Sequence, residues 1–272
     1  MSRMYIRRQQ GRNRIWTARI RAGLAGVLVV ALLLAASAGV LAAEKRVLKV
    51  GSDLTYAPFE FLNDKNEYTG FDVDIIRAVG KALGWEVQII NVGWDGLFAG
   101  LVNGNYDCVI SAVTITPERA KTMSFSTPYY TAETGQVIVV RKDERTIKKP
   151  QDLAGKVVAV QINTTGQYAA EGIQGIKQIK TFNTTPEALQ DVMNGGSQAA
   201  VIDSPVAEEF MKQHPGANLM MAGPPFTHEQ YGIVVRKNDK ALLAQINKGL
   251  ELIRKNGEYQ QIFQKWFGQG KK

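Results

Sequence analysis

Short apolar runs alternate with longer segments in which apolar residues recur at helical spacing through the body of the chain. The run over 46–51 predicts a strand, and the segment after it predicts a helix over 71–83 that Asp72 caps. Further strands are expected over 86–91 and 108–111, each followed by a helical segment. This alternation of strands and helices predicts an open parallel α/β sheet.

The same order of elements begins again in the second half of the chain. A strand is expected over 156–160, a capped helix over 185–193 and a strand over 199–203. The pieces LVNGNYDCVI and DVMNGGSQAAVI stand at equivalent places about 91 residues apart. This weak repeat favours two lobes of similar construction.

Two extended segments belong to neither set of helices and predict a hinge. A chain that crosses out and back predicts two lobes joined by two strands, with hinge segments at 129–137 and 227–233. Lobe 1 is then expected to comprise 44–130 and 232–272, and lobe 2 to comprise 136–226. The chain ends in two helical segments, of which the last is expected to return to lobe 1.

The first 43 residues have a pattern of their own. Seven arginines and no acid lie there, and the stretch 22–43 carries no charge. This pattern predicts a secretory signal peptide over 1–42, cleaved after Ala38 or Ala42. An uncleaved anchor is the alternative, because 22 apolar residues can span a bilayer. No lipid-anchoring cysteine stands directly after the apolar run, so a periplasmic protein without a lipid anchor is expected.

Composition and charge exclude several classes of protein. The chain has 272 residues, of which 45% are hydrophobic and 21% charged, as in an ordinary globular protein. Its formal charge of +8 comes from the N-terminus, because removing seven arginines from 33 basic residues leaves 26 against 25 acids. A nearly neutral body gives no reason to expect a nucleic-acid partner. The single cysteine, Cys108, excludes an internal disulfide.

Candidate chemistry lies where strands end and helices begin, as ligand sites do in open α/β sheets. The segment 111–119 supplies hydroxyls and then Arg119 in a first helical turn. A guanidinium beside free backbone N–H groups suits a carboxylate, although a capped helix with a solvated arginine is the simpler interpretation. The segment 161–166 repeats the arrangement more weakly. Asp203 ends a buried strand and suits an ammonium, or else only caps the next helix.

Three side chains are expected to face these strand ends. Asp53 follows the first strand, Tyr56 stands close behind it, and Trp94 precedes a helix. They can form a slot for a ligand side chain, although aromatic residues more often belong to the core. With Arg119 for a carboxylate and Asp203 for an ammonium, the whole set describes an L-amino acid.

The sequence resembles the polar-amino-acid-binding proteins of bacterial ABC uptake systems, the glutamine-, histidine- and arginine-binding group of solute-binding protein family 3. The resemblance covers 46–268 and is carried by LKVGSDLTYAPFEF, YTGFDVDIIRAVGKALG, YDCVISAVTITPERAKTMSFSTPYY, DLAGKVVAVQINTTG and NGEYQQIFQKWFG. It implies the type II periplasmic-binding-protein fold, a two-lobed clamp that closes on one amino acid and delivers it to a membrane permease. No cofactor or metal is expected. A monomer is expected, because both lobes must move.

The resemblance also implies roles for individual residues. Arg119 falls on the family's carboxylate-binding arginine and Asp203 on its ammonium-binding acid. Asn163 stands where the family often has glycine, but asparagine tolerates a left-handed backbone. The implied contacts to the α-groups are Ser111, Ala112, Thr114 and Thr116, those to the ligand side chain are Asp53, Tyr56, Trp94 and Gln161, and those from the second lobe's helix N-terminus are Thr164 and Thr165.

The identity of the amino acid is argued from Asp53 and Gln161. Asp53 can accept from an amide, a guanidinium or an ammonium, whereas Gln161 both donates and accepts and therefore suits an amide. A buried cation needs more compensation than one carboxylate gives. Glutamine is therefore favoured, with arginine or lysine next, and glutamate is disfavoured by repulsion from Asp53.

Two other functions stay open as alternatives. One is an enzyme resembling cyclohexadienyl dehydratase, which needs a general acid that the sequence does not offer. His214 and His228 both lie in late, loop-like stretches. The other alternative is an anchored receptor, if the N-terminus is retained.

Overall fold

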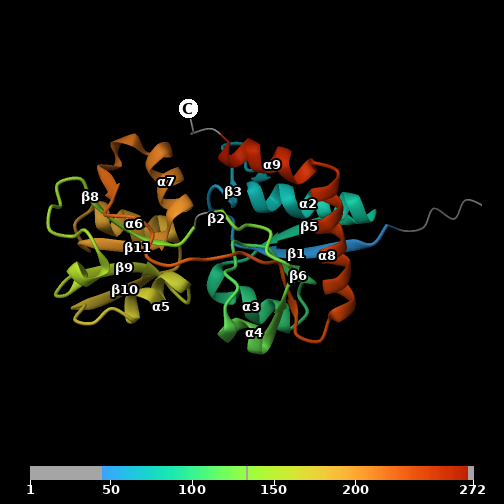
Figure 1. The fold of residues 1–272 in the computed structure, drawn as a ribbon, viewed down its shortest axis with the longest axis horizontal. Helices are drawn as coiled ribbons and strands as arrows, with labels where there is room; N and C mark the ends of the chain where they lie inside the picture. Colours follow the sequence, from blue (N-terminus) through green and yellow to red (C-terminus); the bar gives the residue numbers. More distant parts are fainter. Residues whose placement is uncertain (1–44, 133, 269–272) are drawn as a thin grey trace, which may run out of the picture. The chain divides into compact units, whose positions relative to one another are not determined.

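The computed structural model describes residues 45–132 and 134–268, which belong to one compact unit that begins at Lys45 (Figure 1). The predicted signal peptide over 1–42 lies outside the described residues. Within the described ranges, no helix is both long enough and apolar enough to span a bilayer. The unit contains two five-stranded sheets, each with helices on both faces, and these form the two lobes.

The sheet of lobe 1 has the strand order β5-β1-β6-β13-β7. The first three strands are parallel, and β13 runs antiparallel to both of its neighbours. Helices α2, α8 and α9 cover one face, and α3 and α4 the other (Figure 1). The elements are β1 (Val47–Ser52), α2 (Phe71–Leu83), β5 (Glu86–Asn91), α3 (Trp94–Val102), β6 (Cys108–Val109), α4 (Pro117–Thr122), β7 (Met123–Phe125), β13 (Val234–Arg236), α8 (Lys240–Lys255) and α9 (Glu258–Phe267).

The sheet of lobe 2 repeats this plan with the order β10-β9-β11-β8-β12. The first three strands are again parallel, and the fourth, β8, runs antiparallel to both of its neighbours. The two lobes are thus built alike, as the weak sequence repeat predicts. The elements are β8 (Gln136–Arg141), η1 (Pro150–Leu153), β9 (Val157–Gln161), α5 (Thr165–Glu171), β10 (Gln178–Phe182), α6 (Thr185–Met193), β11 (Ala199–Asp203), α7 (Ser204–Gln213), η2 (Pro215–Ala217) and β12 (Leu219–Met221). The predicted two-lobed α/β fold is therefore confirmed.

The two connections between the lobes run side by side. Tyr129 N donates to Tyr231 O over 2.9 Å, and Glu229 N donates to Thr134 O over 3.0 Å. Gly135 permits this approach, because a Cβ there would lie 1.9 Å from the Thr227 carbonyl oxygen. The predicted hinge segments fall on these connections, except that the first two residues of β8 lie within the first segment.

Several local expectations are wrong. Gly70, with a φ of 133°, stands before α2, and Asp72 lies inside the first turn with its side chain turned away. The strand expected over 108–111 ends at Val109. The expectation of a capped helix over 185–193 is confirmed, and its cap is Thr184. A small antiparallel sheet, not anticipated from the sequence, is made of β2 (Thr55–Tyr56), β3 (Glu60–Leu62) and β4 (Tyr68–Thr69).

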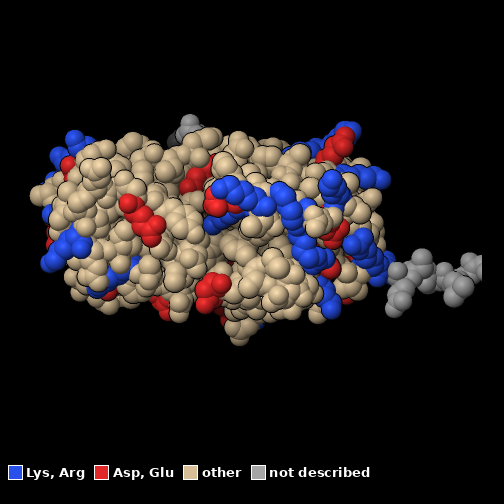
Figure 2. Space-filling view, turned by 90° about the horizontal axis from the view of Figure 1, so that it is seen from below, with Lys and Arg blue, Asp and Glu red and all other residues tan. Residues whose placement is uncertain are grey.

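On the face shown in Figure 2, acidic and basic side chains are interspersed and no continuous basic surface crosses both lobes. This distribution agrees with the near-neutral charge of the body.

Candidate functional site

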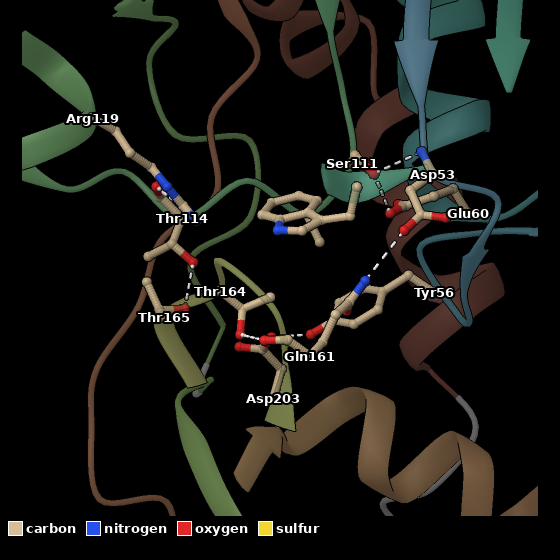
Figure 3. A pocket seen from close by; sticks show the side chains of 12 residues that line it. Asp53, Tyr56, Glu60, Ser111, Thr114, Arg119, Gln161, Thr164, Thr165 and Asp203 are labelled. Atoms are coloured by element: carbon tan, nitrogen blue, oxygen red, sulfur yellow. Dashed lines mark hydrogen bonds between the residues drawn. The ribbon is translucent and has the colours of Figure 1, made fainter. Parts of the chain in front are cut away.

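A cavity lies between the two lobes (Figure 3). Eleven of the twelve residues expected to contact the ligand line it, and so does Glu60, which the sequence did not predict. Thr116, expected as a helper, is absent from the lining, since its hydroxyl accepts from Arg119 N and caps α4. The lining is Asp53, Tyr56, Glu60, Trp94, Ser111, Ala112, Thr114, Arg119, Gln161, Thr164, Thr165 and Asp203.

The topology explains why these residues meet. Asp53 follows β1, Ser111 follows β6, Gln161 ends β9 and Asp203 ends β11. These are the carboxyl ends of the parallel strands in both sheets, where α/β folds place their ligands. The lobes face each other through these edges, so residues 150 positions apart in sequence share one cavity.

Arg119 extends across the cavity rather than into solvent. Its Nη1 donates to the Thr114 carbonyl over 3.0 Å, and its Nη2 donates to the Asn163 carbonyl of the other lobe over 3.4 Å. The guanidinium also lies over the rings of Trp94 and Phe98, 5.4 and 5.5 Å from their centroids. Burial lowers the pKa of Arg119, and the guanidinium keeps its charge, as arginines in proteins do. Of the described residues that line the cavity, it alone carries a positive charge.

Asp203 is buried at the end of β11 and does not act as a cap. It stands in the N-cap position of α7, but its carboxylate makes no bond to that helix. It accepts instead from Tyr56 Oη, across the cleft, and from Gln136 Nε2 over 3.0 Å. Burial raises the pKa of Asp203 well above its ordinary value, and the charge of Glu229 raises it further.

Asp53 and Glu60 place two carboxyl groups at the opposite end of the cavity from Arg119 (Figure 3). Ser111 joins them, because its hydroxyl accepts from Asp53 N over 3.0 Å and donates to Glu60 Oε1 over 2.8 Å. Asp53 also accepts from Gln161 Nε2 across the cleft over 3.3 Å. Within the described part of the chain, Glu60 Oε2 is buried without a hydrogen-bond partner. Burial raises the pKa of both acids, and the charge of Asp72 raises that of Glu60 further.

Two unusual backbone positions shape the cavity wall. Ala112 has a φ of 45°, and its N–H donates to Asp72 over 2.8 Å, which holds this strained turn. Tyr129 Oη donates to the same carboxylate over 2.6 Å. Asn163 has a φ of 58°, so asparagine does adopt the left-handed backbone expected of it. The Asn163 carbonyl then faces lobe 1, where Trp94 Nε1 also donates to it over 3.3 Å.

These groups offer recognition by charge and hydrogen bonding. His214 and His228 are exposed, and neither belongs to the lining. Among the residues that the structure describes, no group of His, Cys, Asp and Glu is arranged to hold a metal ion. A guanidinium at one end, a carboxylate at the floor and two carboxyl groups at the other end suit a small zwitterion that carries a polar side chain.

Residues 48–269 match the family of bacterial extracellular solute-binding proteins, family 3. The match covers most of the chain, so the chain belongs to this family of ABC-transporter solute-binding proteins.

Curated relatives carry the names of transport proteins rather than enzymes. The probable histidine-binding protein of Neisseria gonorrhoeae is 36% identical over 225 residues, which cover 82% of this chain and 83% of the relative. ABC transporter arginine-binding protein 1 of Escherichia coli is 38% identical, over 89% of this chain and 99% of the relative. The L-cystine-binding protein TcyJ of Escherichia coli is 34% identical, over 91% and 96%. Three different amino acids thus appear among the names.

Solved structures share the fold. An ancestral arginine-binding protein bound to glutamine superposes with a TM-score of 0.79 and is 39% identical, covering 83% of this chain and all of that one. An ancestral amino-acid-binding protein described as a precursor of cyclohexadienyl dehydratase gives a TM-score of 0.75 and 41% identity, over 81% and 95%. The fold is therefore the type II periplasmic-binding-protein fold.

Proposed function

We propose that this protein is the extracytoplasmic component of an amino-acid ABC transporter, which binds one polar L-amino acid between its lobes and delivers it to a membrane permease. The observation that carries the proposal is the cavity itself, where one guanidinium and one buried carboxylate stand on opposite lobes with a polar slot beside them. Export after removal of residues 1–42 and a monomeric state belong to the same proposal.

The α-groups of the ligand determine its orientation. Arg119 binds the α-carboxylate, because a guanidinium presents two parallel donors to a carboxylate. Asp203 binds the α-ammonium and exchanges its present bond from Tyr56 for one from the ligand. Thr114, whose hydroxyl lies between the two lobes, assists at the ammonium. We expect a dissociation constant of about 1 μM or lower.

The side chain of the ligand then extends toward Asp53 and Glu60. Glu60 favours a cationic ligand side chain over an amide. One carboxylate does not compensate a buried cation, but two carboxyl groups together with two aromatic faces can. Arginine, with five N–H donors, also offers more hydrogen bonds to these two carboxyl groups than glutamine does. We therefore place arginine first, with glutamine as the alternative.

The lobes close around the ligand. Bonds from Trp94 and Arg119 to the Asn163 carbonyl, and from Gln161 to Asp53, already link the lobes directly. A ligand that adds bonds to both lobes favours the closed form and shifts the population toward it.

The replacement Glu60→Gln tests the ligand order. It keeps the shape of the side chain but removes one charge, so we expect it to weaken L-arginine about tenfold or more and L-glutamine less. Isothermal titration calorimetry measures both. Glu118→Gln, on exposed α4, serves as the control and should change neither affinity. Wild-type protein that binds glutamine more tightly than arginine would contradict the order, and wild-type protein that binds no amino acid would contradict the function.

A further inference from the structure

Two buried polar side chains of the crossing connections lie outside the cavity lining and are hydrogen-bonded to residues that line it. Gln136 begins β8 on the outgoing connection, and Glu229 lies on the returning one. Their residues are 1% and 5% exposed. The two side chains meet, because Gln136 Nε2 donates to Glu229 Oε1 over 3.1 Å. The hinge is thus in direct hydrogen-bond contact with the floor of the site.

The Glu229 carboxylate accepts four hydrogen bonds. Its Oε2 accepts from Thr114 Oγ1 over 2.8 Å and from Thr165 Oγ1 over 3.2 Å, one threonine from each lobe. Its Oε1 accepts from Gln136 and, over 3.4 Å, from Thr227 Oγ1. Four bonds fill the acceptor capacity of a carboxylate.

The carboxylate determines what the two threonines can do. A hydroxyl has one proton and two lone pairs, and an ionised carboxylate can only accept. Thr114 and Thr165 therefore both donate their proton to Glu229. Thr165 Oγ1 also lies 3.3 Å from Gln136 Nε2, a donor. The threonine oxygens that line the cavity are left with lone pairs, which suit a donor on the ligand and repel a carboxylate.

We propose that Glu229 is a positioning residue that fixes Thr114 and Thr165 as hydrogen-bond acceptors and thereby makes the site require an α-ammonium on its ligand. This inference rests on the proposed function and deepens it. The ligand class is amino acids with a free α-ammonium, as against their deaminated, α-hydroxy or α-keto counterparts.

The surroundings of Asp203 agree with this role. Gln136 Nε2 also donates to Asp203 Oδ1 over 3.0 Å, so one amide joins both carboxylates. Its orientation follows from these neighbours, because its oxygen would repel both acids. The charge of Glu229 is one cause of the raised pKa of Asp203. An ammonium placed beside Asp203 and the two threonines would relieve this accumulation of negative charge.

A purely structural role makes a different prediction. If Glu229 only holds the two connections together, its loss lowers the affinity for every ligand by one common factor. If Glu229 acts through the threonine hydroxyls, removing its carboxylate lowers the affinity more for ligands that carry an ammonium than for ligands that lack one.

A cycle of variants and ligands separates the two roles. L-arginine is compared with 5-guanidinopentanoic acid, which lacks only the α-ammonium, and with agmatine, which lacks only the carboxylate. In Glu229→Gln the new amide can donate to a threonine and release its proton toward the ligand. We expect L-arginine and agmatine to weaken about tenfold or more, and 5-guanidinopentanoic acid less than about threefold, by calorimetric competition. Glu208→Gln, exposed on α7, should leave all three unchanged.

Equal weakening of all three ligands in Glu229→Gln would overturn the inference. If thermal melting shows that this variant does not fold, Thr165→Val takes its place, because it removes one acceptor and should weaken the same two ligands selectively. Should wild-type protein prefer L-glutamine, the pair becomes L-glutamine and 5-amino-5-oxopentanoic acid, with the same expectation. Wild-type protein that binds no L-amino acid overturns the proposed function and this inference together, whereas uniform loss overturns the inference alone.

Discussion

Buried acids dominate the ligand site at the scale of single residues. Asp53, Glu60 and Asp203 line the cavity, with Arg119 as the cation among the described lining residues. Burial raises the pKa of each acid, and the charge of Asp72 raises that of Glu60 further. An empty site of this kind retains protons that a cation would displace. The protonation of the acids is therefore linked to the charge of the ligand.

Binding of L-arginine should release more protons than binding of L-glutamine, because both ligands bring an α-ammonium to Asp203 but only arginine brings a second cation to Glu60. The pKa of Glu60 is raised, so below that pKa the group holds a proton, and a guanidinium beside it lowers the pKa and expels the proton. Affinity for L-arginine therefore rises with pH through the raised pKa and then levels off. Burial also raises the pKa of the neighbouring Asp72, to about 6.

Calorimetry in two buffers of different ionisation enthalpy measures the proton release directly. Glu60→Gln is the matched variant and should lose most of it. Equal release with both ligands would show that the protons come from the α-group contacts instead.

Most of the residues that the sequence singled out line the cavity, with instructive exceptions. Arg119 and Asp203 were found because strand ends and helix starts are visible in sequence. Glu60 was missed although it stands between two phenylalanines, where a charged residue is itself a signal of a buried polar role. Glu229 and Gln136 were missed because only the folded hinge brings them to the cavity.

Helix caps connect local structure to the site at the scale of elements. Thr164 caps α5 by accepting from Gln167 N over 3.2 Å, and it also lines the cavity. Thr184 caps α6 in the same way, accepting from Glu187 N over 3.3 Å, but lies outside the lining. Thr184 is therefore a matched control for Thr164, because both residues cap a helix but only Thr164 lines the cavity.

We expect Thr164→Ala and Thr184→Ala to lower the free energy of unfolding by similar amounts, about 1 kcal/mol each. Urea denaturation measures this loss. Only Thr164→Ala should also weaken ligand binding, because the cap holds the loop of Asn163 and Gln161 against lobe 1. Equal effects of the two variants on affinity would show that the α5 cap has no part in the site.

Elements with a strong period were predictable, and those that depend on partners were not. The strands over 86–91 and 199–203 were found at their observed bounds. The small sheet of β2, β3 and β4 was missed because its strands are two or three residues long and are stabilised only by pairing. Asp72 looked like a cap because aspartate often is one, but tertiary contacts to Ala112 and Tyr129 determine its place.

Two lobes on two crossing connections define the molecule at its largest scale. The weak repeat predicted the lobes, and the structure shows the same order of parallel and antiparallel strands in both sheets. After each crossing the chain enters a sheet as an inner antiparallel strand, β8 in lobe 2 and β13 in lobe 1. The sequence could not show this, because such pairing depends on partners that are distant in the chain. The two crossing connections run from β7 to β8 and from β12 to β13.

Ligand should shift the molecule toward the closed form. Small-angle X-ray scattering of the chain lacking residues 1–42 should show a smaller radius of gyration with saturating L-arginine than without it, because the ligand adds bonds to both lobes. Arg119→Ala serves as the control and should show no change on addition. An unchanged radius in a wild-type protein that demonstrably binds would contradict closure as the mechanism.

The central claim is that this cavity recognises an L-amino acid, and thermal melting against a ligand panel tests it most directly. Chain lacking residues 1–42 is unfolded and refolded to remove carried ligand, then melted with each of the twenty L-amino acids, ornithine, citrulline and prephenate. A ligand that binds the native state stabilises it by about 2.7 kcal/mol at a hundred times the dissociation constant, and this raises the melting temperature. We predict a shift with L-arginine, a smaller one with L-glutamine, and none for either in Arg119→Ala. A panel that is flat for all amino acids, or a shift with prephenate alone, would contradict the account.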